Sequence, residues 1–465
     1  MQDSIPSFAV VGHPNRGKSS IVSTLIQNSR VPIDSMPGTT TKSSSHLISL
    51  GSEDLVQFFD TPGFQRPHKV FNLIKEDSQG ADSRHYAVRK FALKSENKEL
   101  YPDEVELLRP IVDGAGIIYV VDGSIPYGEE FDAELEILRW TGQVRMALIN
   151  PIDSDQYVEN WKSALGQFFN VVRVFDAHRA DFNKQLDLLR DFAQLNEGWR
   201  PELLKASDAL LEDRKNKIKK SSEVIAQSLT SMLSLKLEES INDNSNKEEI
   251  IEKLEDKLSK KLVSIEAKSR KGVESIFSHR NLECSDSDLW AEKEPELFSE
   301  ESSQLFGLDR KTLLKYGAFS GAAVGGTLDV ISGGSSLLMG SFLGGLVGAG
   351  TVIFGGDTLA ETKVVFLPLG RKSLQVGPVK NISFPHLVLN RAWSHLVSIL
   401  GRNHSRRGSL DLRKEIENIP PLSEPLAKKI EKEFSKIRSG NNLHLSRSQI
   451  AKLLYKAALE QQKLS

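Results

Sequence analysis

The chain has 465 residues, which is long for one domain and predicts two or three. Its 60 basic residues against 62 acidic residues give a formal charge of −2, so net charge does not point to a nucleic-acid-binding protein. The single cysteine, Cys284, excludes a disulfide framework and a cysteine metal site, and it fits a reducing compartment. The start of the chain lacks a basic region followed by an apolar run, so we expect no secretory signal there.

Short apolar runs alternate with helical stretches in the first part of the chain. The predicted strands are residues 7–12, 55–59, 115–121, 144–149 and 171–175. The predicted helices between them include residues 18–27 and 129–140. This alternation predicts an α/β fold with a mainly parallel sheet, whose ligands bind at the carboxyl ends of the strands.

Residues 12–19, Gly-His-Pro-Asn-Arg-Gly-Lys-Ser, match the pattern G-x-x-x-x-G-K-[ST] between a predicted strand and a predicted helix. In such a loop, backbone N–H groups and the helix N-terminus bind phosphates. Lys18 is expected to reach the β- and γ-phosphates, and the Ser19 hydroxyl is expected to ligate Mg²⁺. The motif predicts a P-loop nucleoside-triphosphate hydrolase. The loop residues expected to bind nucleotide are Gly12, His13, Pro14, Asn15, Arg16, Gly17, Lys18, Ser19 and Ser20.

Two further motifs follow in chain order. Residues 37–41, Pro-Gly-Thr-Thr-Thr, lie in a polar loop, where Thr40 is expected to bind Mg²⁺ and sense the γ-phosphate. Residues 60–63, Asp-Thr-Pro-Gly, follow a predicted strand. Asp60 would hold the Mg²⁺ water shell, and the Gly63 N–H would contact the γ-phosphate. Loss of these contacts on hydrolysis is the usual switch of such proteins.

Together these motifs resemble the TrmE/Era-like branch of translation-factor-class GTPases. The resemblance implies a Ras-like G domain that binds GTP and GDP and hydrolyses GTP with Mg²⁺ at Lys18, Thr40 and Gly63. In that branch a hydrophobic residue, here Phe64, stands where Ras-like proteins carry a catalytic glutamine. Relatives use an asparagine of the phosphate loop, here Asn15, to bind K⁺ during hydrolysis. The resemblance thus implies potassium-stimulated hydrolysis; the alternative role for Asn15 is a loop-stabilising Asx turn.

The base-reading motif departs from the Asn-Lys-x-Asp pattern of the resemblance. Asn150 and Asp153 keep the spacing, but Pro151 replaces the lysine that packs on the base. Asp153 either accepts hydrogen bonds from guanine or caps the next helix. Ala177 stands where relatives have the alanine of Ser-Ala-Lys, and it is expected to present its N–H to the base. A guanine preference is the prediction.

Residues 316–356 are almost free of charge and rich in glycine. Glycines recur every four residues at Gly317, Gly321 and Gly325 and again at Gly340, Gly344 and Gly348. On a helix this spacing gives a smooth face of the kind that pairs in membranes, and residues 331–356 are long enough to cross a bilayer. The stretch forms either a membrane-associated glycine-zipper hairpin or a tightly packed soluble hairpin. Asp329, near the expected turn at 332–335, argues against deep burial.

The rest of the second half predicts helices. No strand signal stands out over residues 201–280. Ile251, Leu254, Leu258, Leu262 and Ile265 form an apolar stripe at helical spacing, which indicates a helix packed on its neighbours or, alternatively, a free coiled coil. Two amphipathic helices are predicted over 422–437 and 448–461.

The whole chain resembles an uncharacterised bacterial family that joins a TrmE/Era-like GTPase to a C-terminal domain of unknown function. The stretches that carry this resemblance are residues 107–122, 134–138, 175–178, the run from 296 through the glycine repeat, 391–393 and 404–407. The expected parts are a G domain over 1–198 with a helical insertion at about 64–113, a helical region over 199–312, the glycine-rich hairpin over 313–357 and a mixed, mainly helical region over 358–465.

The leading interpretation is a slow, Mg²⁺-dependent and potassium-stimulated GTPase that acts as a switch. Its G domain would be cytoplasmic and would associate with the cytoplasmic membrane and with a protein effector. One alternative is a ribosome- or RNA-associated assembly GTPase, which the mixed charge of the C-terminal half disfavours. A second alternative is a nucleotide-binding scaffold with little hydrolysis.

Overall fold

The computed structural model divides the chain into two compact units, one up to Arg214 and one that starts at Lys215. The division falls inside helix α9 (Arg200–Leu233), a little beyond the predicted boundary at residue 198. The residues that the structure describes are 5–26, 43–50, 53–177, 180–242, 244–277, 360–366, 372–379, 381, 384–401 and 419–463. Thr40, His178 and the glycine-rich stretch 313–357 therefore lie outside the described residues.

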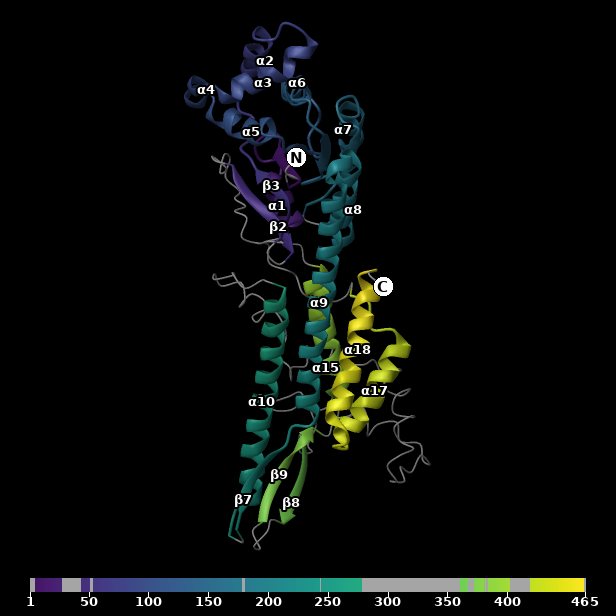
Figure 1. The fold of residues 1–465 in the computed structure, drawn as a ribbon. Coiled ribbons are helices and arrows are strands. Elements are labelled where there is room, and N and C mark those ends of the chain that lie inside the picture. The colour runs from purple at the N-terminus through teal and green to yellow at the C-terminus, as the bar shows by residue number, and fades with distance from the viewer. Residues whose placement is uncertain are drawn as a thin grey trace. The chain divides into compact units, whose positions relative to one another are not determined.

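The first unit is built on a six-stranded sheet with the order β2-β3-β1-β4-β5-β6 (Figure 1). Its strands are β1 (Ser7–Val11), β2 (Ser44–Leu50), β3 (Glu53–Asp60), β4 (Gly116–Asp122), β5 (Arg145–Asn150) and β6 (Val171–Val174). All neighbours pair in parallel except β2 and β3, which are antiparallel. The predicted mainly parallel α/β sheet is confirmed. Strand β2 was not predicted, because its serines and histidine interrupt the apolar run.

Both faces of this sheet are covered, which is why its central strands are continuous apolar runs. Alternate residues of β1 enter opposite cores: Phe8 and Val10 join one cluster, and Ala9 and Val11 join the other. The first cluster is completed by α1 (Lys18–Leu25), α8 (Phe182–Leu195) and the start of α9. The second is completed by α2 (Pro67–Glu76), α3 (Arg84–Leu93), α5 (Pro102–Val112), α6 (Asp132–Trp140) and α7 (Val158–Leu165).

The segment between β3 and β4 is helical. It contains α2, the 3₁₀ turn η1 (Ala81–Ser83), α3, α4 (Ser95–Leu100) and α5. Pro67 and Pro102 stand at the starts of α2 and α5, where a missing N–H costs no intrahelical bond. Figure 1 shows these helices gathered into one group beside the strands. The chain therefore returns to β4 only after forming this group of helices, in which α2, α3 and α5 share one core cluster with α6, α7 and a face of the sheet.

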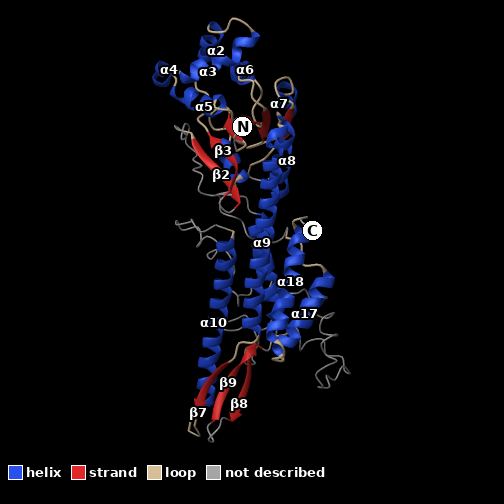
Figure 2. Cartoon of the chain, viewed as in Figure 1, coloured by secondary structure: helices blue, strands red, loops and turns tan. Residues whose placement is uncertain are grey.

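The second unit combines long helices with a small sheet, as Figure 2 shows. Its helices are the second half of α9, α10 (Lys247–Ile276), α15 (Phe384–Gly401), α17 (Glu424–Arg438) and α18 (Leu443–Gln461). The antiparallel sheet has the order β7-β9-β8, with β7 (Leu237–Ile241), β8 (Ala360–Phe366) and β9 (Lys372–Val379). The helices predicted over 422–437 and 448–461 are confirmed. The prediction of no strand within 201–280 is wrong, because β7 forms by pairing with β9, far away in sequence.

The apolar stripe of α10 is part of a packed helix. Leu254, Leu258 and Leu262 are buried, which excludes the free coiled coil.

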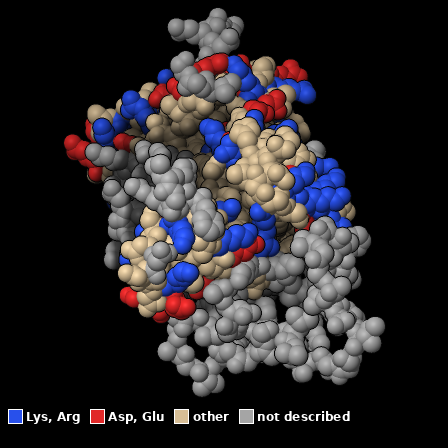
Figure 3. All heavy atoms as spheres, turned by 90° about the horizontal axis from the view of Figure 1, so that it is seen from below, with Lys and Arg blue, Asp and Glu red and all other residues tan. Residues whose placement is uncertain are grey.

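In the described ranges, no helix combines the length and the apolar character that a membrane crossing requires. On the face shown in Figure 3, lysine and arginine side chains form separate groups with acidic and uncharged side chains between them.

Candidate nucleotide-binding site

The phosphate loop runs from the end of β1 to the start of α1, and its two glycines are fixed by close neighbours. Gly12 has φ +141°, and a Cβ there would lie 2.3 Å from the carbonyl oxygen of Val120 on β4. Gly17 has φ +84°, and a Cβ there would lie 2.3 Å from the side-chain nitrogen of Asn150 on β5. Only glycine therefore allows the loop to close against the ends of these two strands.

The Lys18 amine is folded back onto the loop. Its Nζ donates to the carbonyl oxygens of Gly12 at 3.3 Å and His13 at 3.0 Å. Burial lowers the pKa of Lys18 to about 8, although the negative charges of Asp60 and Glu134 oppose the shift. The amine lies in a desolvated place where phosphate oxygens would be strong partners.

Asp60 and Ser19 form the candidate magnesium site. Asp60 ends β3, is 2% exposed and accepts a hydrogen bond from the Ser19 side chain. Burial raises the pKa of Asp60, against the pull of Ser19 and Lys18. Among the described residues, its Oδ1 is buried without a hydrogen-bond partner. An uncompensated buried carboxylate oxygen beside a hydroxyl fits Mg²⁺, which prefers oxygen ligands.

The residues after Asp60 lie directly against the phosphate loop. The Thr61 hydroxyl donates to the carbonyl oxygen of Val10 at 2.7 Å, and the Phe64 N–H donates to that of Gly12 at 3.4 Å. A Cβ on Gly63 would lie 2.5 Å from the nitrogen of Pro14. The Phe64 side chain is fully buried in the core, so this position presents no polar group to the site.

Asn15 is exposed and adopts φ 62°, a left-handed conformation that asparagine tolerates better than most residues. Its side chain makes no hydrogen bond to any residue of the described part of the chain, so the Asx turn is not formed. The side-chain amide is therefore uncommitted at the rim of the loop.

Asn150 joins the loop to the segment that follows β6, the last strand of the sheet. Its Nδ2 donates to the carbonyl oxygen of Arg16 at 3.3 Å, and its Oδ1 accepts the N–H of Ala177 at 3.1 Å. Asn150 is 1% exposed. The Ala177 N–H, which is expected to face a base, donates to Asn150 in this structure, and its contact with a base stays a prediction.

Asp153 is exposed beyond the end of β5, and it makes no hydrogen bond to another described residue. The capping interpretation is wrong, because α7 begins at Val158 with Tyr157 at its N-cap. The carboxylate is thus open to an external donor.

Glu134 of α6 is a site residue that the sequence analysis missed. It is 0% exposed, its Oε1 lies 2.9 Å from His13 Nδ1, and its Oε2 accepts the Tyr119 hydroxyl at 2.9 Å. Asp122, also missed, lies 3.2 Å from Arg16 Nη1. Glu134 could have been found from helical spacing, since it falls on the same buried face as Ile137 and Leu138. The two carboxylates thus hold the phosphate loop through His13 and Arg16.

Comparison with known protein families identifies both parts of the chain. Residues 162–461 match the family model described as domain of unknown function (DUF3482), which is more than half of the chain. The chain belongs to the DUF3482 family. Residues 7–144 of this DUF3482 protein match the model described as 50S ribosome-binding GTPase, so the phosphate loop lies in a P-loop GTPase domain.

Individual relatives resemble only part of the DUF3482 protein. GTPase Der of Buchnera aphidicola subsp. Baizongia pistaciae is 39% identical over 71 residues, 15% of each chain. The tRNA modification GTPase MnmE of Oceanobacillus iheyensis is 24% identical over 163 residues, 35% of this chain and 34% of the relative. The chain thus spans about a third or less of these relatives. A solved structure of Era with MgGDPNP and 16S ribosomal RNA nucleotides shares 13% identity, covering 59% of this chain and 90% of that chain with a TM-score of 0.28.

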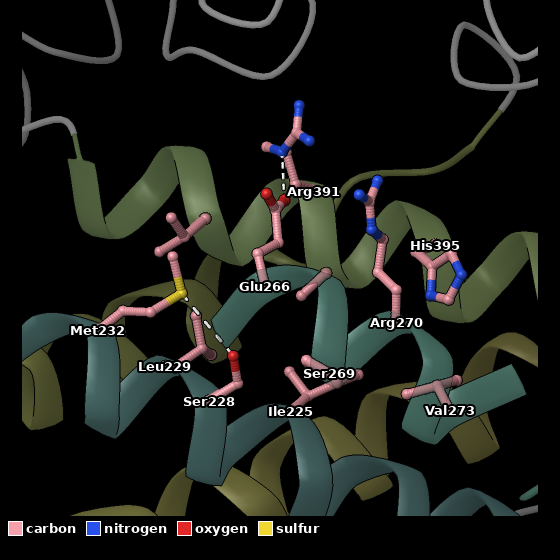
Figure 4. Close-up of a pocket in the computed structure, with 12 residues that line it drawn as sticks. Ile225, Ser228, Leu229, Met232, Glu266, Ser269, Arg270, Val273, Arg391 and His395 are labelled. Carbon is pink, nitrogen blue, oxygen red and sulfur yellow. Dashed lines mark hydrogen bonds and ion pairs between the residues drawn. The ribbon is translucent and has the colours of Figure 1, made fainter. Parts of the chain in front are cut away.

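The second unit has a cavity between α9, α10 and α15, drawn in Figure 4. Glu266 of α10 pairs there with Arg391 of α15, and Arg270 and His395 lie alongside. The cavity volume is about 20 Å³, enough for one water molecule. It is too small for a nucleotide.

Proposed function

We propose that the DUF3482 protein binds GTP and GDP and hydrolyses GTP slowly in the presence of Mg²⁺. The observation that carries the proposal is the phosphate loop with Ser19 beside the buried, incompletely bonded carboxylate of Asp60. Mg²⁺ held by these two residues would supply positive charge near the phosphates. Lys18 would exchange two loop carbonyls for phosphate oxygens. Turnover is slow because Phe64 offers no amide to orient water.

The proposed preference for guanine rests on Asp153 and Asn150. The Asp153 carboxylate is exposed, and a carboxylate accepts hydrogen bonds from the ring and amino nitrogens that guanine offers and adenine lacks. Asn150 supports this position indirectly, because it holds together the phosphate loop and the segment after β6.

Potassium stimulation through Asn15 is part of the proposal. Asn15 is exposed in the phosphate loop, and its side chain is not engaged by other described residues. A K⁺ ion at its side-chain amide oxygen would add positive charge near the transferred phosphoryl group.

The test measures binding of GTP, GDP and ATP by the full chain, followed by single-turnover hydrolysis in KCl and in NaCl. We expect binding of both guanine nucleotides, weak binding of ATP and faster turnover in KCl. Asn15→Ala should turn over equally in the two salts, and Lys18→Ala should bind poorly. Absence of nucleotide binding by the wild type would refute the function, and equal wild-type rates in both salts would refute the role of K⁺ alone.

We also propose that the protein is a switch whose G domain is cytoplasmic and whose residues 313–357 associate with the cytoplasmic membrane. The support is the sequence alone: residues 331–356 carry no charged side chain and have glycines at helical spacing. Carbonate extraction of cell membranes tests this, since complete release into the soluble fraction would exclude stable insertion.

A second candidate function is association with the ribosome. The specific observation in its favour is the match of residues 7–144 to the 50S ribosome-binding GTPase model. Sedimentation with purified 50S subunits in GTP-analogue and GDP buffers tests it. Binding in only one nucleotide state would support the ribosomal role, and absence of binding in both would remove it.

A further inference from the structure

The helical segment between β3 and β4 is bonded to the residues that follow Asp60-Thr61-Pro62-Gly63 through a single buried carboxylate. The backbone N–H groups of Gln65 and Arg66 both donate to Oε1 of Glu104, at 3.1 and 2.6 Å. Glu104 belongs to α5 and is 1% exposed. Hydrogen bonds to an ionised acceptor shielded from water are the strong kind.

This carboxylate completes the start of α2. Arg66 is the N-cap of α2 but provides no side-chain cap, and Pro67 at the first helical position has no N–H. Glu104, although it belongs to α5, provides this cap by accepting the Arg66 N–H. Its negative charge lies at the positive end of the α2 dipole. It also lies in the first turn of α5, so one carboxylate serves the starts of two helices.

The Arg66 side chain adds a second tie to the same helices. Its Nη1 donates to the carbonyl oxygen of Leu100 at 3.2 Å, and its guanidinium lies 5.6 Å from the centre of the Tyr101 ring. Residues 65 and 66 are thus held by both backbone and side chain on the junction of α4 and α5.

The other end of this short segment belongs to the nucleotide site. Gly63 lies against Pro14 of the phosphate loop, and Phe64 donates its N–H to the carbonyl oxygen of Gly12. The Phe64 side chain is locked in the core. Within residues 63–66 the chain therefore passes from the phosphate loop to α5 with a bond at nearly every step. A displacement of Gly63 would therefore also move residues 64–66.

Helix α5 also contacts the segment that follows the Thr40 loop. The Ser43 hydroxyl donates to the carbonyl oxygen of Glu106 at 2.9 Å. Two segments that each follow a predicted γ-phosphate contact are therefore both bonded to α5, one at Glu104 and one at Glu106.

From these contacts we infer that Glu104 is a positioning residue that couples the nucleotide state of the phosphate site to the helices α2–α5. The inference rests on the proposed GTPase function and names the regulation of that site. A γ-phosphate that draws in Gly63 moves residues 65 and 66, and Glu104 passes this movement to α5. The surface formed by the inserted helices α2–α5 thus differs between the GTP-bound and the GDP-bound state.

The test is hydrogen exchange of residues 102–112 with GDP and with a non-hydrolysable GTP analogue, together with single-turnover rates. In the wild type, we expect exchange in this helix to differ between the two nucleotides. Glu104→Ala should bind both nucleotides within about twofold of wild type, lose the exchange difference and turn over about tenfold more slowly, as expected of a misplaced reactive segment. Glu104→Gln should keep most of the difference, because its amide oxygen still accepts both N–H groups.

Glu99→Ala, an exposed glutamate of α4, is the matched control and should behave as wild type. Arg66→Ala removes only the exposed tie and should reduce the exchange difference even if Glu104→Ala fails to fold. A wild type that binds and hydrolyses GTP with no nucleotide-dependent exchange in α5 would overturn the coupling alone. So would a folded Glu104→Ala that keeps both the exchange difference and the rate. A wild type that binds no nucleotide would instead overturn the proposed function.

Discussion

The Lys18 amine makes a quantitative prediction about pH. Burial lowers its pKa from 10.5 to about 8. Phosphate oxygens favour the charged ammonium, so bound nucleotide raises this pKa again. Binding of GTP must therefore take up protons at any pH where the free amine has begun to deprotonate. The affinity for GTP should be highest well below pH 8 and should fall as the pH rises through 8.

The size of the effect follows from the titration curve. A group with a pKa of about 8 is about nine-tenths protonated at pH 7 and about one-quarter protonated at pH 8.5. The affinity for GTP should thus fall about fourfold between these pH values. Proton uptake on binding should rise from about 0.1 to about 0.8 per nucleotide over the same range.

Titration calorimetry in two buffers of different ionisation enthalpy measures this uptake directly. Lys18→Arg is the matched control, because its guanidinium stays charged throughout and should bind without uptake in this range. Equal proton uptake by the wild type at pH 7 and pH 8.5 would show that the amine is not desolvated in the free protein. The inference from its burial would then be wrong.

Two further predictions concern stability and are checked by urea unfolding. Gly12→Ala should lower the free energy of unfolding by about 3 kcal/mol, because the new Cβ meets the Val120 carbonyl oxygen in a strained conformation. Gly114→Ala is the control, because Gly114 has φ +114° but a Cβ there would meet no atom within 4 Å, and it should lower the free energy of unfolding by only about 1 kcal/mol. Equal losses of unfolding free energy in the two variants would contradict the clash at Gly12. Glu266→Met should lower the free energy of unfolding by about 2 kcal/mol, because it removes the carboxylate that accepts a hydrogen bond from the buried Arg391, whereas the double change to methionine at both positions should cost less. A single change as mild as the double one would show that the pair is not desolvated.

The sequence predicts the sheet of the first unit well because local and global preferences agree there. Two central strands have apolar runs that end at a polar residue, β3 at Asp60 and β4 at Asp122. The phosphate-loop pattern then places Lys18 and Ser19 by its required strand and helix. The register of β1 against β3 sets Val10 beside Asp60, which brings the loop and the magnesium carboxylate together.

The small sheet of the second unit was not predictable in this way. Strand β7, Leu-Glu-Glu-Ser-Ile, has charged residues at its centre and follows a long helix. It becomes a strand because Glu239 pairs with Leu374, over a hundred residues further along the chain. Such pairing depends on tertiary contacts that no local window contains.

The residues missed at the nucleotide site share a different cause. Glu104 and Glu134 look like ordinary helix glutamates, which are usually solvent-exposed. Both are almost fully buried, and each accepts hydrogen bonds from a segment distant in sequence. Their role depends on where α5 and α6 pack, which helical periodicity indicates only as a face.

The buried charges around the phosphate loop have one consequence in common. Lys18, Asp60 and Glu134 are each desolvated, and among the described residues Asp60 keeps one carboxylate oxygen without a hydrogen bond. Burying ionised groups costs free energy unless partners are supplied. Mg²⁺ would bring positive charge to the Asp60 carboxylate, and nucleotide phosphates would add anionic partners for the Lys18 amine beside Asp60 and Glu134. Because residues 63–66 link that same place to Glu104, the free energy gained on binding is available to move α5. The proposed switch therefore depends on the packing of residues 63–66 between the loop and Glu104 as well as on the loop pattern itself.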